Sequence, residues 1–310
     1  MVRFSVVIPT YNRARVIGRA IECVFRQTLP PEELIIVDDG STDDTVAVIR
    51  AAGPRVRLIQ ADHGGPSKAR NRGVREAVSD WIAFLDSDDL WHPDYLTRMA
   101  HAIETTQGAA AYYFSDVEYR RGGIPSFHWT NCGYQVQDDV TLIPQATSLV
   151  MGERHPMLLP FTVFRRETYL GVGGLMESLW SGEDTHLFIR LGLSEPLCAV
   201  RGSGGIVTTD EAESGNRLTV AFNTSTSRRW TGMVRLYEDL LSRRELLTNE
   251  VRAEFRNRLA YSHWRVARLS MGEHRFGQVL LPLFRSVTTD PTVIPHVLMD
   301  AAGRLFSHSE

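Results

Sequence analysis

Cysteine is scarce in this sequence, and lysine is scarcer. The 310 residues contain three cysteines, Cys23, Cys132 and Cys198, and no CxxC pair. An odd number of widely spaced cysteines excludes a disulfide scaffold and is typical of a reducing compartment. Lys68 is the single lysine in a chain rich in arginine, a bias that we attribute to the codon usage of the source genome rather than to function.

Long hydrophobic runs are absent as well. No apolar stretch approaches the ~18 residues that a membrane-spanning helix needs. The N-terminus, MVRFSVVIPT, lacks the charged region, the long apolar region and the cleavage site of a secretory leader. We therefore expect a cytoplasmic protein.

A large net charge of either sign is also missing. The formal net charge of −3 gives no global reason to bind nucleic acid, so we expect no nucleic-acid partner. Charge is uneven along the chain, because residues 217–310 hold fourteen arginines against nine acidic residues, an excess of +5 that leaves −8 for the rest. This basic part permits peripheral contact with the inner face of a membrane, or a homodimer through C-terminal helices, and solvated helix faces explain it equally well.

What the sequence does contain is an alternation of strand and helix patterns over its first third. The apolar fraction of 43% is ample for a core, and the length has room for roughly two domains of about 150 residues. Amphipathic helix patterns separate four short apolar runs that predict strands buried on both faces: 4–8, 34–38, 56–60 and 81–85. This order predicts an α/β fold with a mostly parallel, doubly wound, Rossmann-like sheet, whose ligand crevice lies at the carboxyl ends of the strands.

The pattern loosens after the fourth strand. We expect a helix at 94–104, a strand at 111–117 and a long, substrate-covering loop at 121–139. From about residue 216 amphipathic helices replace the strands, one of them predicted from the spacing of Phe276, Val279 and Leu283. We therefore predict one domain with two halves, residues 1–115 and residues 116–215. A helical C-terminal subdomain follows at 216–310.

Polar side chains follow the first two predicted strands. Pro9 interrupts the ladder of the first strand, and a hydroxyl, an aromatic ring and an amide follow it and suit a flat nucleobase: Thr10, Tyr11 and Asn12. Alternatively, Pro9 ends the strand and Asn12 caps the next helix. The second strand ends in Asp38 and Asp39, which are costly to ionise there unless they are hydrogen-bonded, so we interpret them as recognition groups for an N–H donor rather than loop caps.

Three carboxylates follow the fourth strand: Asp86, Asp88 and Asp89. In an extended segment Asp86 and Asp88 point the same way, so their oxygens can converge on one divalent cation or on sugar hydroxyls, and a solvated turn is the alternative. The chain has no GxxxxGK[ST] loop, so phosphates must be met by the cation and by cationic side chains. Three such side chains begin the third helix, where surface charges are the alternative interpretation: Lys68, Arg70 and Arg72.

Five segments together resemble a known family. In order and spacing, four of them look like the motifs of a family 2 glycosyltransferase with the GT-A fold: Val7–Asn12, Val37–Asp43, Ala69–Gly73 and Leu85–Asp89. Residues Gly173–Leu175, followed by Ser181–Leu191, are similar to the acceptor-side segment of that family. The resemblance covers roughly residues 1–200, so it implies a nucleotide-sugar-binding half at 1–115 and an acceptor-binding half at 116–215.

The resemblance implies an inverting transfer of a sugar from UDP, dTDP or GDP to a glycan, lipid-linked or natural-product acceptor, with Mn²⁺ or Mg²⁺ as cofactor. Asp184 matches the base that deprotonates the acceptor hydroxyl, and Glu183 is the neighbour that orients it or touches the acceptor. The alternative from the residues alone is that both acids start an amphipathic helix, where the helix dipole favours them.

The resemblance also assigns roles on the donor side. It places Thr10, Tyr11 and Asp39 at the nucleobase, Arg72 at the base or diphosphate, and Asp88 on the metal. Asp86 meets the ribose or the metal shell, and four more residues complete the donor site: Pro9, Asn12, Lys68 and Ser87. The sequence departs from the family near Thr208–Glu211, where many relatives have a histidine and this chain has none, which puts a further metal or phosphate ligand in doubt.

The acceptor side is the least specified part. We expect it to involve the loop at 122–137 and residues 160–162, with four candidate contacts: Trp129, Tyr134, Thr162 and Trp180. Packing of the second half's core is the alternative for each aromatic residue. Two competing functions stay open: a nucleotidyltransferase, which would be expected to show a glycine-rich basic loop after the first strand, and an inactive nucleotide-sugar-binding scaffold, which the intact Asp86, Asp88 and Asp184 argue against.

Overall fold

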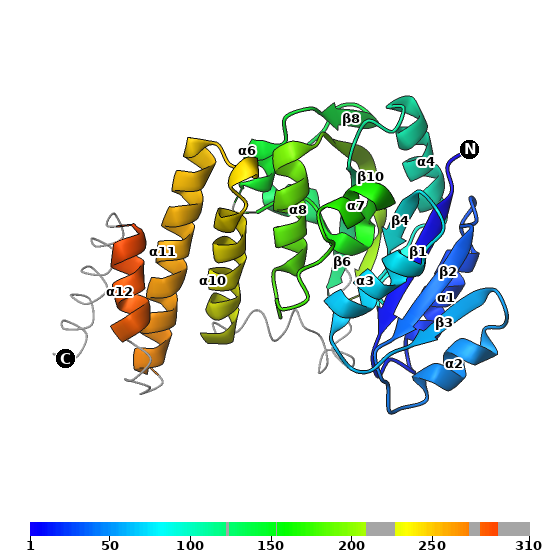
Figure 1. Cartoon of the computed structure of the whole chain (residues 1–310). Helices are drawn as coiled ribbons and strands as arrows, with labels where there is room; N and C mark the ends of the chain where they lie inside the picture. The colour runs from blue at the N-terminus through cyan, green and yellow to red at the C-terminus, as the bar shows by residue number, and fades with distance from the viewer. Residues whose placement is uncertain (122–123, 153, 209–226, 273–279, 291–310) are drawn as a thin grey trace. The chain divides into compact units, whose positions relative to one another are not determined.

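The computed structural model describes residues 1–121, 124–152, 154–208, 227–272 and 280–290 (Figure 1). The chain divides into two compact units, residues 1–177 with 183–215 and residues 178–182 with 216–310. The further division at residue 115 stays a prediction. Among the described helices, none combines the length and the apolarity that crossing a membrane would take.

A ten-stranded sheet organises the described part of the first unit. Its first half has the order β3-β2-β1-β4, formed by β1 (Phe4–Thr10), β2 (Glu33–Asp38), β3 (Val56–Gln60) and β4 (Trp81–Phe84). All three pairings are parallel, and the register sets Thr10 beside Asp38. The carboxyl ends of β1, β2 and β4 therefore share one edge of the sheet.

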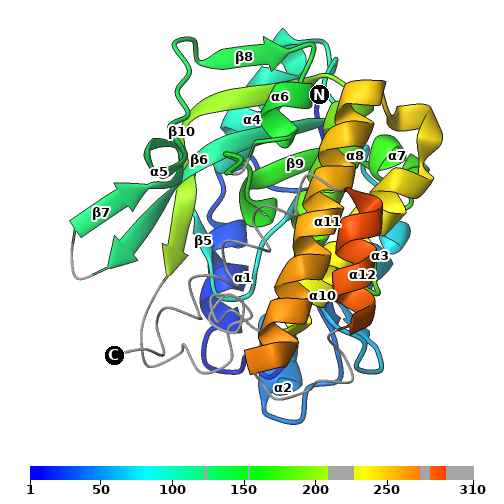
Figure 2. The same ribbon diagram turned by 90° about the vertical axis from the view of Figure 1, so that its left-hand side faces the viewer.

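The second half continues from β4 through β9 (Thr162–Arg165), β6 (Tyr112–Arg121), β10 (Leu197–Thr208) and β5 (Leu90–Trp91). β9 is antiparallel to both β4 and β6, so β6 and the parallel β10 run in the direction of β1. Two short strands join from outside, β7 (Ile124–Phe127) against β6 and β8 (Val140–Ile143) against β10 (Figure 2). The predicted mostly parallel α/β sheet is confirmed.

Helices connect these strands. The main ones are α1 (Ile17–Phe25), α2 (Thr45–Ala51), α3 (Pro66–Glu76), α4 (Tyr95–Thr105) and α8 (Glu183–Ser194), and the shorter ones are α5 (His128–Cys132), α6 (Thr147–Val150), η1 (Leu159–Phe161) and α7 (Arg166–Gly171). α3 packs directly on β1, because a Cβ added at Gly73 would lie 2.4 Å from Val7 Cγ1. Gly65, with φ of +91°, occupies the N-cap position of this helix, and Pro66 follows as the first helical residue.

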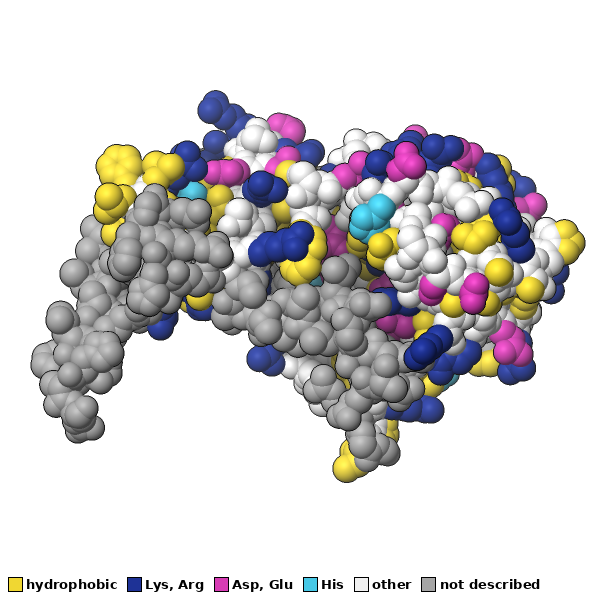
Figure 3. Space-filling model, turned by 90° about the horizontal axis from the view of Figure 1, so that it is seen from below, with side chains coloured by type: hydrophobic (Ala, Val, Ile, Leu, Met, Phe, Trp, Pro, Cys, Tyr) yellow, Lys and Arg dark blue, Asp and Glu magenta, His cyan; other side chains and the backbone are white. Residues whose placement is uncertain are grey.

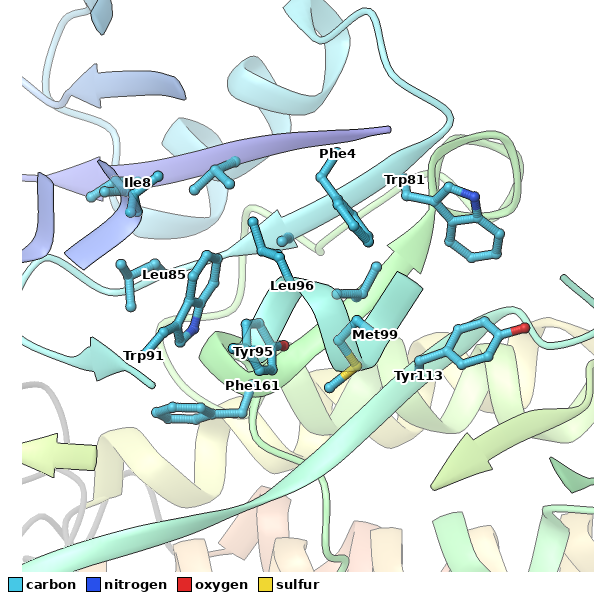
Figure 4. Close-up of a cluster of buried hydrophobic side chains, with 14 of the residues drawn as sticks. Phe4, Ile8, Trp81, Leu85, Trp91, Tyr95, Leu96, Met99, Tyr113 and Phe161 are labelled. Carbon is cyan, nitrogen blue, oxygen red and sulfur yellow. The ribbon is translucent and has the colours of Figure 1, made fainter. Parts of the chain in front are cut away.

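The core lies between the sheet and α4. Figure 4 shows Phe4, Ile8 and Leu85 facing Leu96 and Met99 of α4. The rings of Trp91 and Tyr95 lie 4.6 Å apart, and the Trp91 indole N–H donates to the Pro160 carbonyl at 2.7 Å. This satisfied donor lets a large aromatic side chain lie fully inside the core.

Three local expectations differ from the structure. β1 continues through Pro9 to Thr10, because its pairing with β4 ends at Val7 and a residue without an N–H is tolerated beyond that point. β3 is the edge of the sheet and is half-exposed, not buried on both faces. The predicted long loop at 121–139 contains β7 and α5 in its described part.

The second unit is helical, as predicted. α10 (Ser227–Ser242) packs against α11 (Asn249–Gly272), which packs against α12 (Leu280–Thr289), with the short helix η3 (Arg244–Leu246) between α10 and α11. Leu283 lies in α12, whereas Phe276 and Val279 lie outside the described residues. On the face shown in Figure 3, acidic and basic side chains of the described residues are interspersed.

Candidate active site

The candidate site lies at the carboxyl edge of β1, β2 and β4. Thr10 is the last residue of β1, Asp38 ends β2 and Asp39 follows it, and Asp86 comes two residues after β4. The Asp39 N–H donates to the Thr10 carbonyl at 2.8 Å, and this hydrogen bond holds the carboxyl ends of β1 and β2 together. The parallel sheet thus brings side chains from distant parts of the sequence to one place.

Asp39 is buried and held by the loop that leads into α3. Its two carboxylate oxygens accept the N–H groups of Gly64 and Gly65, both at 2.8 Å. His63 Nδ1 lies 2.9 Å from Asp39 Oδ2. Asp39 Oδ1 has a second acceptor position, so Asp39 can still accept an N–H from a ligand.

An aromatic pair stands next to this carboxylate. The rings of Tyr11 and His63 lie 4.3 Å apart at 32°, and both side chains are exposed. Thr10, in contrast, is buried, and its Oγ1 has no hydrogen-bond partner among the described residues. A flat ring beside a buried acceptor and an unsatisfied hydroxyl is a surface on which a heterocyclic base can bind.

Asn12 has a structural role in this loop. Its φ is +52°, its Oδ1 accepts the Thr42 N–H at 2.8 Å, and its own N–H donates to Ser41 Oγ at 2.9 Å. The side chain therefore joins the loop after β1 to the loop after β2.

Lys68 is exposed and lies over Gly64, since a Cβ added at Gly64 would lie 3.1 Å from Lys68 Nζ.

Asp86 does not lie in an extended segment, and that expectation is wrong. Ser87 and Asp88 form a turn in which the Asp89 N–H donates to the Asp86 carbonyl at 3.1 Å. The Asp88 carbonyl accepts a hydrogen bond from Thr208 Oγ1 at 2.5 Å, so the end of β10 supports this turn. Residues 209–211, the rest of the segment in which we expected a departure from the family, lie outside the described residues.

Arg70 joins this turn to the start of α8. Its Nη2 lies 2.5 Å from Asp86 Oδ1, and its Nη1 lies 3.7 Å from Glu183 Oε1. The Arg70 side chain is 7% exposed, Asp86 is 32% exposed and Glu183 is 16% exposed. Asp86 is thus more accessible to solvent than the guanidinium that it contacts.

Two acids begin α8, as the helix-start alternative predicted. Asp184 Oδ1 accepts the Thr185 N–H at 2.6 Å. Burial, and then the neighbouring Asp184, raise the pKa of Glu183 to about 7, and Arg70 opposes part of this rise. A carboxyl that titrates near neutral pH is suited to proton transfer, so the start of α8 can both bind a hydroxyl and accept its proton.

Buried polar side chains fix α8 relative to α3. Asn71 Nδ2 donates to the Leu175 carbonyl at 2.8 Å, and its Oδ1 accepts the Leu175 N–H at 2.9 Å. Arg190, 2% exposed, donates to the carbonyls of Val172 and Gly174. The segment of Gly173–Leu175 is therefore held from both sides, by α3 and by α8.

A divalent cation fits the donor set at the turn. Among the described residues no group of three or more histidine, cysteine or acidic side chains could enclose a metal ion. Asp86 is partly exposed and Asp88 is half-buried, and each carries a carboxylate at this turn. Mg²⁺ and Mn²⁺ with phosphate ligands are held by one or two carboxylates, and that is the kind of site these residues can form.

Several predicted residues lie apart from this site. Arg72 is 52% exposed and pairs with Glu76 at 2.9 Å on its own helix. Thr162 is fully buried and donates to the Leu158 carbonyl, and Trp129 is 5% exposed with its indole N–H on the Pro156 carbonyl. Buried side chains cannot meet an acceptor in this conformation, and for Trp129 the packing alternative describes the structure.

The other two acceptor candidates also have protein partners. Tyr134 lies with its ring 5.0 Å from Trp129 in an edge-to-face arrangement. Trp180 belongs to the second unit, where the Arg228 guanidinium lies 4.1 Å from the ring centroid.

From the sequence we expected Arg70 to meet phosphates together with Lys68 and Arg72, whereas the structure sets it against Asp86 and Glu183. The sequence did contain a pattern that indicates burial of Arg70. Arg70, Gly73 and Val74 have the spacing of one helix face, and this face of α3 is buried. No pattern in the sequence predicts the contact of His63 with Asp39, since the two belong to different loops.

Comparison with known sequences agrees with this geometry. Residues 5–147 match the model of the family described as Glycosyl transferase family 2. An uncharacterized glycosyltransferase of Rickettsia felis is 33% identical over 221 residues, which cover 66% of this chain and 34% of the relative, so the chain spans about a third of that protein. The succinoglycan biosynthesis protein ExoW of Rhizobium meliloti is 28% identical over 245 residues, which cover 72% of this chain and 76% of ExoW.

Solved structures are similar in fold. S. aureus TarS in complex with UDP-GlcNAc superposes with a TM-score of 0.66 at 19% identity, covering 93% of this chain and 81% of that one. The mannosyltransferase PcManGT from Pyrobaculum calidifontis, in complex with GDP-Man and Mn²⁺, has a TM-score of 0.56 at 17% identity and covers 99% of this chain and 81% of that one. Residues 5–147 therefore belong to glycosyl transferase family 2, a family of sugar-transferring enzymes, and the chain has the predicted GT-A fold.

Proposed function

We propose that this chain transfers a sugar from a nucleoside diphosphate sugar to an acceptor hydroxyl, with inversion at the anomeric carbon and with the help of a divalent cation. The observation that carries the proposal is the convergence of Asp39, Asp86 and Glu183 at one end of the sheet. A carboxylate that accepts an N–H of the nucleobase, a turn that can bind a cation, and the pair of Glu183 and Asp184 that offers a general base to the acceptor hydroxyl are the three parts that such a transfer needs.

The donor nucleotide binds along the exits of β1 and β2 in this proposal. Tyr11 and His63 provide an aromatic surface, and Asp39 accepts an imide N–H of the base. UDP is the favoured nucleotide before dTDP and GDP, because the structurally similar TarS binds UDP-GlcNAc. The other donor-side residues are proposed from their places around this edge: Pro9, Thr10, Asn12, Lys68 and Ser87. Arg72, which pairs with Glu76, is proposed from the resemblance to the family alone.

Asp86 and Asp88 hold Mn²⁺ or Mg²⁺ together with the diphosphate. When bound, the cation neutralises the charge that grows on the departing nucleoside diphosphate. The similar PcManGT structure, which contains Mn²⁺ with GDP-Man, supports this part of the proposal. Asp86 contributes its oxygen from the orientation that Arg70 gives it.

Asp184 is the proposed general base, and Glu183 lies beside it. A single displacement needs one base, whereas a retaining double displacement would also need a nucleophile. The first turn of α8 provides two carboxyl groups whose environments differ, since Glu183 is buried against Arg70 and Asp184 accepts the Thr185 N–H. An acceptor hydroxyl that enters over this turn would lose its proton to Asp184.

The proposed acceptor is a growing polysaccharide or a lipid-linked glycan, supported by the similarity to the succinoglycan biosynthesis protein ExoW. An inactive nucleotide-sugar-binding scaffold or a nucleotidyltransferase would need neither an inverting base nor an acceptor hydroxyl over α8.

Calorimetric titration with UDP, dTDP and GDP tests the proposal. Each nucleotide is added with Mn²⁺ or with EDTA to the wild type, to Asp88→Asn and to the control Asp94→Asn, an exposed aspartate at the start of α4. We expect Mn²⁺-dependent binding of UDP by the wild type and the control, and its loss in Asp88→Asn. Absence of nucleotide binding to the wild type would refute the proposal, and undiminished binding by Asp88→Asn would refute the metal assignment.

A further inference from the structure

Arg70 is a buried cation between the two acidic parts of the site. Its guanidinium contacts Asp86, sixteen positions along the chain, at 2.5 Å and stands 3.7 Å from Glu183 of α8. A charged group that is 7% exposed is costly to bury unless anions compensate for it. The two carboxylates provide this compensation, one on the turn after β4 and one on α8.

The hydrogen bonds of Arg70 differ from those of an arginine that supports the fold. Arg190, also buried, donates to the backbone carbonyls of His186, Val172 and Gly174 and so ties α8 to the segment at 172–174. Arg70 Nε and Nη1 are buried and have no hydrogen-bond partner within the described part of the chain. Arg70 therefore contacts side chains of the site and leaves donors unused, which is a poor arrangement for stability alone.

We propose that Arg70 is a positioning residue that holds the Asp86 carboxylate in the orientation in which it binds the cation and diphosphate. Glu183 is the second anion, and it keeps the guanidinium in place between α3 and α8. The proposal rests on the proposed function, because it assigns Asp86 to the cation. Residues that orient a metal-binding carboxylate typically change metal affinity by about 10–100-fold when they are replaced.

The substitution Arg70→Lys distinguishes the effect of the positive charge from the effect of the guanidinium geometry. A lysine keeps the positive charge, but its single nitrogen cannot reach toward Asp86 and Glu183 with two separate donors as the guanidinium does. The matched control is Arg75→Lys on the same helix, because Arg75 is 54% exposed and lies 3.9 Å from Glu177 outside the site. Both variants retain the net charge of the chain.

The experiment is calorimetric titration of the wild type, Arg70→Lys and Arg75→Lys with UDP in the presence of Mn²⁺ and, separately, of EDTA. We expect Arg70→Lys to raise the Kd for UDP with Mn²⁺ by about 10–100-fold. Its Kd in EDTA and its thermal unfolding without ligand should stay close to those of the wild type, and Arg75→Lys should match the wild type throughout. A merely structural role would instead lower the unfolding temperature and leave the Kd of the folded protein unchanged.

A second variant keeps the test open if Arg70→Lys does not fold. Arg70→Met with Glu183→Gln removes the cation together with one of its anions, which avoids an uncompensated buried charge, and we expect the same loss of Mn²⁺-dependent affinity. Equal Kd values for wild type and variants would refute the inference alone. An equal loss with EDTA would also refute it, since Arg70 would then contact the nucleotide directly. Failure of the wild type to bind UDP, dTDP or GDP would refute the proposed function itself.

Discussion

Replacement of Glu183 by glutamine should change how stability depends on pH. The pKa of Glu183 rises from its ordinary 4.5 to about 7, chiefly through burial and then through Asp184, with Arg70 opposing part of the rise. At 1.36 kcal/mol per pKa unit, this rise corresponds to about 3 kcal/mol. The side chain is 16% exposed, so solvent screening takes little from this figure.

The sign follows from where the proton is bound. Between pH 4.5 and about 7 the folded state keeps the Glu183 proton while the unfolded state releases it, so this group lowers the free energy of unfolding of the wild type as pH rises. Glutamine has no proton to lose. The free energy of unfolding of Glu183→Gln relative to the wild type should therefore increase by about 3 kcal/mol between pH 4.5 and pH 8.

Urea denaturation at intervals of half a pH unit measures this difference. Titrating groups that do not interact with Glu183 are common to both proteins, so their contributions cancel in the difference between the two curves, which then contains Glu183 and its interaction with Asp184. Glu22→Gln, at an exposed position on α1 paired with Arg26, is the matched control for the loss of a carboxyl group. A difference between wild type and Glu183→Gln that stays constant from pH 4.5 to pH 8 would show that Glu183 is not buried as the structure has it.

Two further substitutions test the base and the packing of α3. Asp184→Asn should lower the rate of sugar transfer by about 10²–10⁴ in steady-state kinetics while calorimetry shows unchanged donor binding, and near-normal turnover would remove its role as base. Gly73→Ala should cost about 1–3 kcal/mol in urea denaturation, because the new Cβ would lie 2.4 Å from Val7 Cγ1. Gly171→Ala, which has no atom within 4 Å of its new Cβ, should stay within about 0.5 kcal/mol of the wild type, and equal costs for the two would contradict the packing argument.

The order of strands and helices could be predicted because each element carries its own local signal. The apolar runs at 34–38 and 56–60 coincide with β2 and β3 almost residue for residue. An apolar run predicts that a segment is a strand of a sheet, but it does not predict which strand lies at the edge of that sheet. The exposure of β3 became visible only with the strand order, since nothing pairs with its outer side in the described sheet.

Predictions failed where a residue's conformation depends on distant partners. Asp86 and Asp88 lie in a turn rather than an extended segment, and the turn is supported by Thr208, which is 120 residues away in the chain. Likewise, Trp129 is as suitable for stacking as any tryptophan, yet β6 and the carbonyl of Pro156 enclose it. Local patterns hold no information on such contacts.

By itself the sequence determined the family, the alternating α/β order and the acidic residues at the strand exits, because motif spacing and hydrophobic periodicity are local properties of the chain. The tertiary structure alone decided which charges meet. It buried Arg70 between Asp86 and Glu183, placed Arg72 on the exposed face of the same helix, and set His63 against Asp39. Two arginines two positions apart differ in this way because a helix turns by about 100° per residue, and only the packing of α3 on β1 decides which of its faces lies inside.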